Sequence, residues 1–200
     1  MNNKILALCG FVLAAPYGLV SAAMTSSTGG EIKFTGYLVD TACAVESESA
    51  NLVVVFNEIR IAQFTGDDPT ATVKPAGVAS KARLPFKIKL GGCNPDVSSN
   101  ASVRFSAVAD PDALSSNLPD AGTMIVAGLG AQASSGVALQ IFDLCNLPVK
   151  VDGLTQTQAI TLQPGENEFI FSAGYVSVLP SDQITVGDAT ATVNFNVDYD

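Results

Sequence analysis

The fold-determining stretch begins at Gly29 and reads Gly-Gly-Glu-Ile-Lys-Phe-Thr-Gly-Tyr-Leu-Val-Asp-Thr-Ala-Cys-Ala-Val, ending at Val45. Its apolar residues Ile32, Phe34 and Leu38 share one phase of a two-residue period, and Gly36 falls in the same phase. This alternation predicts an extended strand with one apolar face. A glycine on that face indicates a close approach to the backbone.

The segment before this strand, Met1–Ala22, has the pattern of a secretory signal. Lys4 supplies the positive start, Ile5–Ala15 is apolar, and small residues offer a cleavage site before Ala23. The apolar run is too short for a transmembrane helix. Cys9 lies inside this leader, so we expect it to be removed with it.

Composition favours one exported all-β domain. The 200 residues are 48% hydrophobic and 14% charged, and short runs rich in Val, Ile, Phe and Thr lie between turn residues. The formal charge is −9, and loss of Lys4 with the leader leaves nine basic against 19 acidic residues, or −10. Such a chain repels phosphate backbones, which excludes nucleic acid as an expected partner. The absence of histidine removes Ser-His and Cys-His catalysis and histidine-based zinc sites.

About eight short strand-like runs follow, with no periodicity of helical length, and they predict a β-sandwich. The last run alternates most regularly, with Ala191, Val193, Phe195, Val197 and Tyr199 in one phase. A long turn-rich stretch is expected over 110–130. The expected strands are Leu52 to Ile59, Leu84 to Leu90, Ala101 to Val108, Val137 to Ile141, Val149 to Val151, Ala159 to Leu162, Glu168 to Tyr175 and Ala191 to Tyr199.

Three cysteines remain in the mature chain. Export to an oxidising compartment favours one disulfide, and Cys43 and Cys93 each stand beside a strand-like run, so we expect these two to pair. Cys145 lies in an expected turn and is left over, and a buried or partly shielded free thiol is the preferred interpretation. Pairing between molecules is less favoured, and a catalytic thiol without histidine least of all.

Other charged groupings have structural explanations. Asp110–Asp112 could suggest calcium ligands, but no spaced acids and terminal glutamate follow, so turn capping is preferred. Glu166 and Glu168 are interpreted as a solvated strand face rather than a catalytic carboxylate pair. Lys87 and Lys89 could bind an anion, but lysines on an edge strand also discourage aggregation, which we prefer. No catalytic residue, metal ligand or cofactor site is predicted.

With these residues in hand, the sequence resembles the major subunits of type 1 fimbriae, which are assembled by the chaperone–usher route. The resemblance covers essentially the whole mature chain. It rests on the stretches Gly29–Gly36, Ala42–Val45, Pro85–Leu90 leading to Cys93, Gly136–Asp143 and Phe171–Tyr175, and on the alternating end with its penultimate Tyr199.

This resemblance implies an immunoglobulin-like sandwich that lacks its last strand and is completed by a strand from another subunit. The open groove, lined by Val193, Phe195, Val197 and Tyr199, would face a periplasmic chaperone first. The arm of the next subunit would then replace the chaperone and insert its donor residues, namely Ile32, Phe34, Gly36 and Leu38.

The expected organisation is a signal peptide over 1–22, a donor-strand arm over 23–40 and a pilin domain over 41–200. The expected partners are related pilin subunits, the chaperone and an outer-membrane usher, with no small-molecule substrate and no cofactor. The protein would reach the cell surface through the periplasm and support adhesion without being an enzyme. The alternative is a self-contained secreted β-sandwich that acts as an adhesin or lectin.

Overall fold

The computed structural model describes residues 31–36, 41–64, 73–128 and 130–200. The chain divides into two units, Met1–Leu38 and Val39–Asp200. In the first unit, residues 31–36 form no regular secondary structure, and the side chains of Ile32 and Phe34 are 77% and 89% exposed. The expected signal peptide, Cys9 and Leu38 lie outside the described residues.

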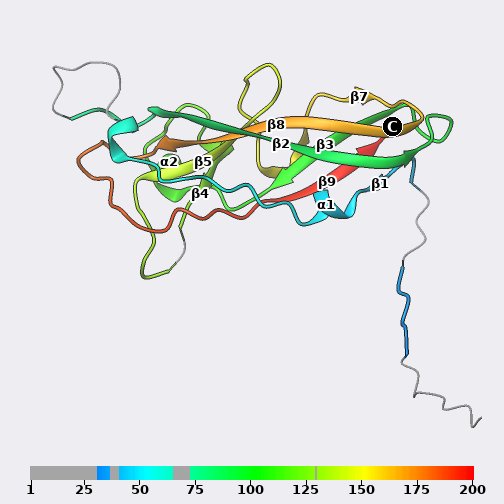
Figure 1. Cartoon of the computed structure of the whole chain (residues 1–200). Helices are drawn as coiled ribbons and strands as arrows, with labels where there is room; N and C mark the ends of the chain where they lie inside the picture. The colour runs from blue at the N-terminus through cyan, green and yellow to red at the C-terminus, as the bar shows by residue number, and fades with distance from the viewer. Residues whose placement is uncertain (1–30, 37–40, 65–72, 129) are drawn as a thin grey trace, which may run out of the picture. The chain divides into compact units, whose positions relative to one another are not determined.

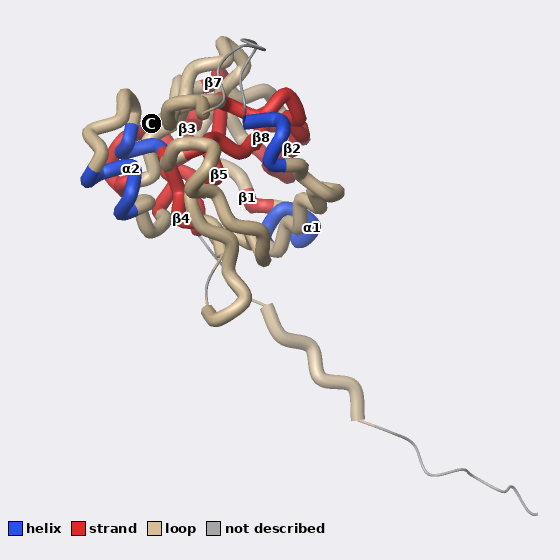
Figure 2. The backbone as a smooth tube through the Cα atoms, turned by 90° about the vertical axis from the view of Figure 1, so that its left-hand side faces the viewer, coloured by secondary structure: helices blue, strands red, loops and turns tan. Residues whose placement is uncertain are grey.

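The second unit is mostly β-structure, with short helices at different parts of its periphery (Figures 1 and 2). In chain order its elements are β1 (Ala44–Val45), α1 (Ser47–Ala50), η1 (Ile61–Phe64), β2 (Ala79–Cys93), β3 (Asn100–Ser106), α2 (Pro111–Ser115), η2 (Ala121–Thr123), β4 (Met124–Val126), β5 (Val137–Phe142), β6 (Asp152–Gln156), β7 (Ile160–Thr161), β8 (Gly165–Ser177) and β9 (Asn194–Tyr199).

The strands form two antiparallel sheets. The larger sheet has the order β1-β2-β8-β5-β4, and its long central pair of β2 and β8 runs through the whole body in Figure 1. In the smaller sheet β3 is central. Strands β6 and β7 pair with one of its edges, and β9 pairs with the other. The expected all-β sandwich is confirmed.

The core lies between the sheets because alternate residues of each strand point inward. Val103 and Phe105 of β3 are buried against Phe169 and Phe171 of β8, and the Phe105 and Phe171 ring centroids are 5.0 Å apart in an edge-to-face contact. Pro85 pairs with Ser172 of β8 but lies where β1 no longer flanks β2, since β1 reaches only Leu90 and Gly91. Proline is therefore on the edge position expected of it.

Two expectations about strands were wrong. Leu52–Ile59 is not a strand in the described structure, because no neighbouring strand supplies a hydrogen-bonding ladder. Apolar, β-branched composition favours an extended chain but cannot provide that partner. Val149–Val151 also lies outside the ladders, and the strand there is β6, which starts at Asp152.

The expected turn-rich stretch over 110–130 contains more structure than predicted, namely α2, η2 and β4. Helix α2 starts because the Asp110 carboxylate accepts hydrogen bonds from the backbone N–H groups of Asp112 and Ala113, while Pro111 occupies the first turn. This agrees with capping, the preferred interpretation of Asp110–Asp112. Burial raises the pKa of Asp110, while the Ala113 hydrogen bond opposes that rise.

The disulfide joins Cys43 and Cys93, as expected, across a sequence separation of 50 residues. Cys145 is a free thiol in the turn after β5, as expected for its position, but it is exposed rather than shielded. All four residues from Leu144 to Leu147 are exposed, so Cys145 lies in a surface turn rather than against the core. Within the described ranges, no helix has the length and apolar content needed to cross a membrane.

Candidate functional site

The C-terminal strand β9 is held along one edge by β3. Its six residues pair in register with β3, from Asn194 opposite Ser106 to Tyr199 opposite Ala101. Across the described ranges, β9 has β3 as its one strand partner, so its other edge is open. An open edge presents backbone N–H and C=O groups to any strand that can lie beside it.

Burial changes sharply between β3 and β9. Inward residues Ala101, Val103 and Phe105 of β3 are almost completely buried, whereas their partners on β9 remain partly exposed. Other partly exposed apolar side chains pack against the same core. We call the partly buried apolar residues of two chain segments, 56–61 and 189–199, the half-buried row; they are Phe56, Ile59, Ile61, Ala189, Ala191, Val193, Phe195, Val197 and Tyr199. The apolar interior is therefore incompletely covered along this row.

Tyr175 of β8 connects the two chain segments that supply the row. Its ring meets that of Phe56 edge-on, with centroids 5.0 Å apart, and its hydroxyl donates a 2.6 Å hydrogen bond to the carbonyl oxygen of Ala189. Burial raises the pKa of Tyr175, and the negative charge of Asp188 raises it further. The neutral hydroxyl thus stays available as a donor.

The chain leading into β9 is fixed against the 128–135 loop. The N–H of Gly128 donates to the carbonyl of Thr190 at 2.9 Å, and the N–H of Ser134 donates to the carbonyl of Asp188 at 2.8 Å. Gly128 has φ +80°, and a side chain there would collide with the Asp188 carbonyl, so glycine is required. These contacts hold the chain at Asp188 and Thr190, just before β9 begins at Asn194.

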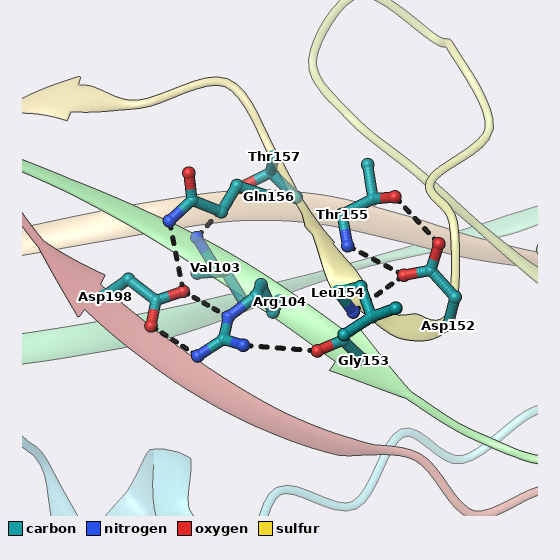
Figure 3. Close-up of polar contacts among 9 residues, drawn as sticks. All are labelled: Val103, Arg104, Asp152, Gly153, Leu154, Thr155, Gln156, Thr157 and Asp198. Atoms are coloured by element: carbon teal, nitrogen blue, oxygen red, sulfur yellow. Dashed lines mark hydrogen bonds and ion pairs between the residues drawn. The ribbon is translucent and has the colours of Figure 1, made fainter.

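The outward face of β9 carries an ion pair, drawn in Figure 3. The Arg104 guanidinium on β3 donates from Nε and Nη2 to the two carboxylate oxygens of Asp198, at 2.5 and 2.6 Å. Its Nη1 donates to the carbonyl of Gly153, which belongs to β6. The hydrogen bond from Arg104 lowers the pKa of Asp198, and the same bond raises the pKa of Arg104.

The end of the chain is also bonded to the body. The Tyr199 hydroxyl donates to the backbone carbonyl of Cys43, and the N–H groups of Ser99 and Asn100 donate to the Asp200 carbonyl. These bonds and the Arg104–Asp198 pair act on consecutive residues, so the last three positions of the chain are all anchored.

The structure brings some predicted site residues together. Val193, Phe195, Val197 and Tyr199 lie in the half-buried row, although Val193 just precedes β9. The sequence interpretation missed Phe56, Ile59, Ile61, Tyr175 and Arg104. Phe56 and Ile59 fell within a run that was interpreted as a strand, and nothing in the sequence links Arg104 to Asp198.

The other candidate groupings carry no separate site. Lys87 pairs with Glu168 at 2.8 Å and Lys89 lies 3.6 Å from Glu48, so both lysines have acidic neighbours on an exposed surface. Among the residues that the structure describes, no three Asp, Glu or Cys side chains gather in a metal-binding arrangement.

Known proteins share both this sequence pattern and this fold. The model of the family described as "Fimbrial protein" matches residues 32–200. A "Fimbrial subunit type 1" from Salmonella typhimurium is 33% identical over 100% of this chain and 97% of its own length. A "Probable major fimbrial subunit LpfA" from Escherichia coli O157:H7 is 30% identical over 95% of this chain and 98% of its own length.

Solved structures give the same architecture. A subunit from the structure of a chaperone–usher pilus superposes with a TM-score of 0.64 at 21% identity, covering 90% of this chain and 100% of that chain. The P pilus rod subunit PapA superposes with a TM-score of 0.60 at 20% identity, covering 80% of this chain and 100% of its own. The fold is thus an incomplete immunoglobulin-like β-sandwich, and the chain belongs to the fimbrial protein family of chaperone–usher subunits.

Proposed function

We propose that this protein is a structural subunit of a type 1-like fimbria that polymerises by donor-strand exchange. The observation that carries the proposal is the half-buried row beside the open edge of β9. A strand from another subunit would satisfy the free backbone groups of β9 and cover the apolar side chains at the same time.

The N-terminal arm has the pattern that this edge needs. Ile32 and Phe34 are strongly exposed, and they alternate with the polar residues Glu31, Lys33 and Thr35. In a strand beside β9, Ile32, Phe34 and Leu38 would point inward, and burial of each would contribute roughly 1.5–3 kcal/mol. Gly36 would occupy the point where the fit leaves no room for a side chain.

This function defines the expected parts and partners of the protein. Residues 1–22 are the export signal, 23–40 the donor arm and 41–200 the body. A periplasmic chaperone covers the open edge of β9 before assembly, and an outer-membrane usher passes the subunit to the cell-surface fimbria. The role is structural rather than enzymatic, and the polymer supports cell adhesion.

The alternative is a self-contained adhesin or lectin module. A self-contained sandwich would cover its own interior, whereas here Phe195, Val197 and Tyr199 remain partly exposed along an unpaired edge of the described body. This observation favours the polymerising subunit.

Deletion of Ala23–Leu38 tests the proposal. The body keeps its disulfide and its open edge, so the truncated subunit should still accept a donor strand, but it should have none to donate. In mixtures with the intact protein, the truncated subunit should therefore be found only at one end of a polymer, as its terminal subunit. Extended polymers containing truncated subunits with normal neighbours on both sides would contradict the assignment, and size measurement together with mass spectrometry of the polymers distinguishes the outcomes.

A further inference from the structure

The apolar pattern of β9 does not by itself define which β3 residue faces which β9 residue. Ala191, Val193, Phe195, Val197 and Tyr199 are all apolar or aromatic and recur every second position. A slip by one residue would turn this set outward, but a slip by two would keep it facing the core. Two alternative registers therefore satisfy the hydrophobic pattern nearly as well as the observed one.

The polar contacts distinguish these registers. In the observed register Arg104 stands opposite Asn196 and reaches diagonally to Asp198. A slip that places Arg104 opposite Asn194 would move the carboxylate about 7 Å along the strand, which separates the ion pair. Asn194 and Asn196 carry no charge that could replace it.

A slip in the other direction would place Asp198 opposite Arg104, where an ion pair could form again. In the observed register Tyr199 is bonded to the Cys43 carbonyl and Asp200 to Asn100. This slip would break both contacts. The bonds at the chain end thus oppose this slip, and the ion pair opposes the first.

Arg104 is well placed to define register because it lies on β3 and bonds to both neighbouring strands, β9 and β6. Its guanidinium spans from Asp198 on β9 to the carbonyl of Gly153 on β6, as Figure 3 shows, and all three of its nitrogens donate. The side chains of Arg104 and Asp198 are 32% and 24% exposed, so the pair is only partly screened by water. A bidentate arginine–carboxylate pair also demands one relative position of its two partners.

We propose that Arg104 and Asp198 are positioning residues that hold β9 in the register in which a donor strand is accepted. The proposal rests on the proposed function, since a donor would add to the edge of β9 opposite β3. The register of the donor strand would then be set by the position of the β9 residues with which it pairs. Arg104 lies on β3, one strand away from the edge that the donor would join, and the Asp198 carboxylate is bonded to Arg104, so the pair acts on the donor through the register of β9. A cross-strand pair of opposite charges stabilises a sheet only modestly, so the main effect expected of this pair is to favour one register over the others.

The test uses the full-length mature subunit and, as donor probe, a fluorescent synthetic peptide of this chain's residues 29–40. Asp198→Asn and Arg104→Met should each weaken peptide binding about fivefold, a modest loss because the ion pair is partly exposed. Arg104→Lys keeps the charge without the planar fork and should fall between them and the wild type. Asp152→Asn is the matched control, because this substitution also removes one negative charge close to Arg104. The side-chain bonds of Asp152 go to Leu154 and Thr155 of its own turn, not to β9.

Register is measured separately by the cross-strand NOEs between β3 and β9, which need no donor. Asp198→Asn should show a second set of contacts with Arg104 opposite Asn194, while Asp152→Asn should show the wild-type set alone. A single wild-type register in both Asp198→Asn and Arg104→Met would overturn the proposal, whether or not the peptide binds. Failure of the wild-type subunit to bind the peptide would instead count against the donor-strand function.

Discussion

The hydroxyl of Tyr199 donates a 3.1 Å hydrogen bond to the backbone carbonyl of Cys43, joining residues 156 positions apart. Cys43 is one half of the disulfide and lies next to β1, while Tyr199 is the last residue of β9. The bond therefore ties the end of the C-terminal strand to the start of the body.

Tyr199→Phe should lower the free energy of unfolding by about 1 kcal/mol, because it removes this hydrogen bond and keeps the ring. Tyr199→Leu should cost more, since the partly buried ring also packs against the core. Urea denaturation of the two variants measures both effects. Equal stability of Tyr199→Phe and wild type would show that the hydroxyl contributes nothing.

The disulfide should stabilise the body far more than the free thiol does. Replacing both Cys43 and Cys93 by serine should cost about 4 kcal/mol in the chain-entropy account of a loop of this length. Cys145→Ser, at an exposed turn, should change stability by less than about 0.5 kcal/mol. Thermal unfolding of the three proteins gives the comparison, and a large effect at Cys145 would contradict the exposed position.

Stability should fall in acid partly through Asp198. Hydrogen bonds from Arg104 and, to a smaller extent, Gln156 hold the folded pKa of Asp198 below the ordinary value of an aspartate. Its contribution is present above that value and is lost as the pH falls through the lowered folded pKa. Asp152, whose pKa is lowered to about 2 by hydrogen bonds from Thr155 and Leu154, should behave likewise.

The acid limb of the stability curve should accordingly become shallower in Asp198→Asn than in the wild type. Arg104→Met should reproduce most of that change, since Arg104 is the main cause of the Asp198 shift. Urea midpoints between pH 2 and pH 7 provide the measurement. An unchanged pH dependence in both variants would mean that the ion pair is not formed in solution.

Gly36→Leu should block assembly while leaving the isolated subunit intact. Among the described residues, a Cβ at Gly36 meets no atom within 4 Å, so the subunit itself should tolerate the substitution. In a neighbour's edge the larger side chain would be overpacked, at a cost of about 1–3 kcal/mol. Thr35→Leu lies in the outward phase and should be milder. The test measures polymer length and the yield of monomeric subunit for both variants and the wild type. Loss of stability in the isolated Gly36→Leu subunit would instead indicate that residues 31–36 form an ordinary internal strand.

Sequence alone predicted the parts of this fold in which local pattern and burial agree. The alternation from Ala191 to Tyr199 identified β9 and its inward face, because one of the two phases is apolar throughout and the other is polar. Cys43 and Cys93 were paired correctly because each stands beside a strand-like run of the sequence. Asp110-Pro111 is a helix-start signal that was interpreted only as turn capping, since α2 is too short to show periodicity.

The remainder depends on contacts between distant residues. Leu52–Ile59 has the composition of a strand, but whether it pairs depends on a partner that the sequence does not reveal. Arg104 and Asp198 are 94 positions apart, and polar residues on an outward face give no sign of their partners. The incomplete coverage of Phe195 and Val197 could likewise be seen only once both sheets were in place.

The central claim is that the arm of one subunit lies along β9 of another. Polymers should be assembled from equal parts of ¹⁵N-labelled and unlabelled full-length protein, with a photo-crosslinking residue in place of Phe34. Mass spectrometry then identifies the captured peptides. The account predicts crosslinked peptide pairs in which one peptide is labelled and the other is not, joining the arm to residues 189–199 or 56–61. Crosslinks confined to peptides of a single isotopic mass, or directed to the outward face of the sandwich, would contradict it.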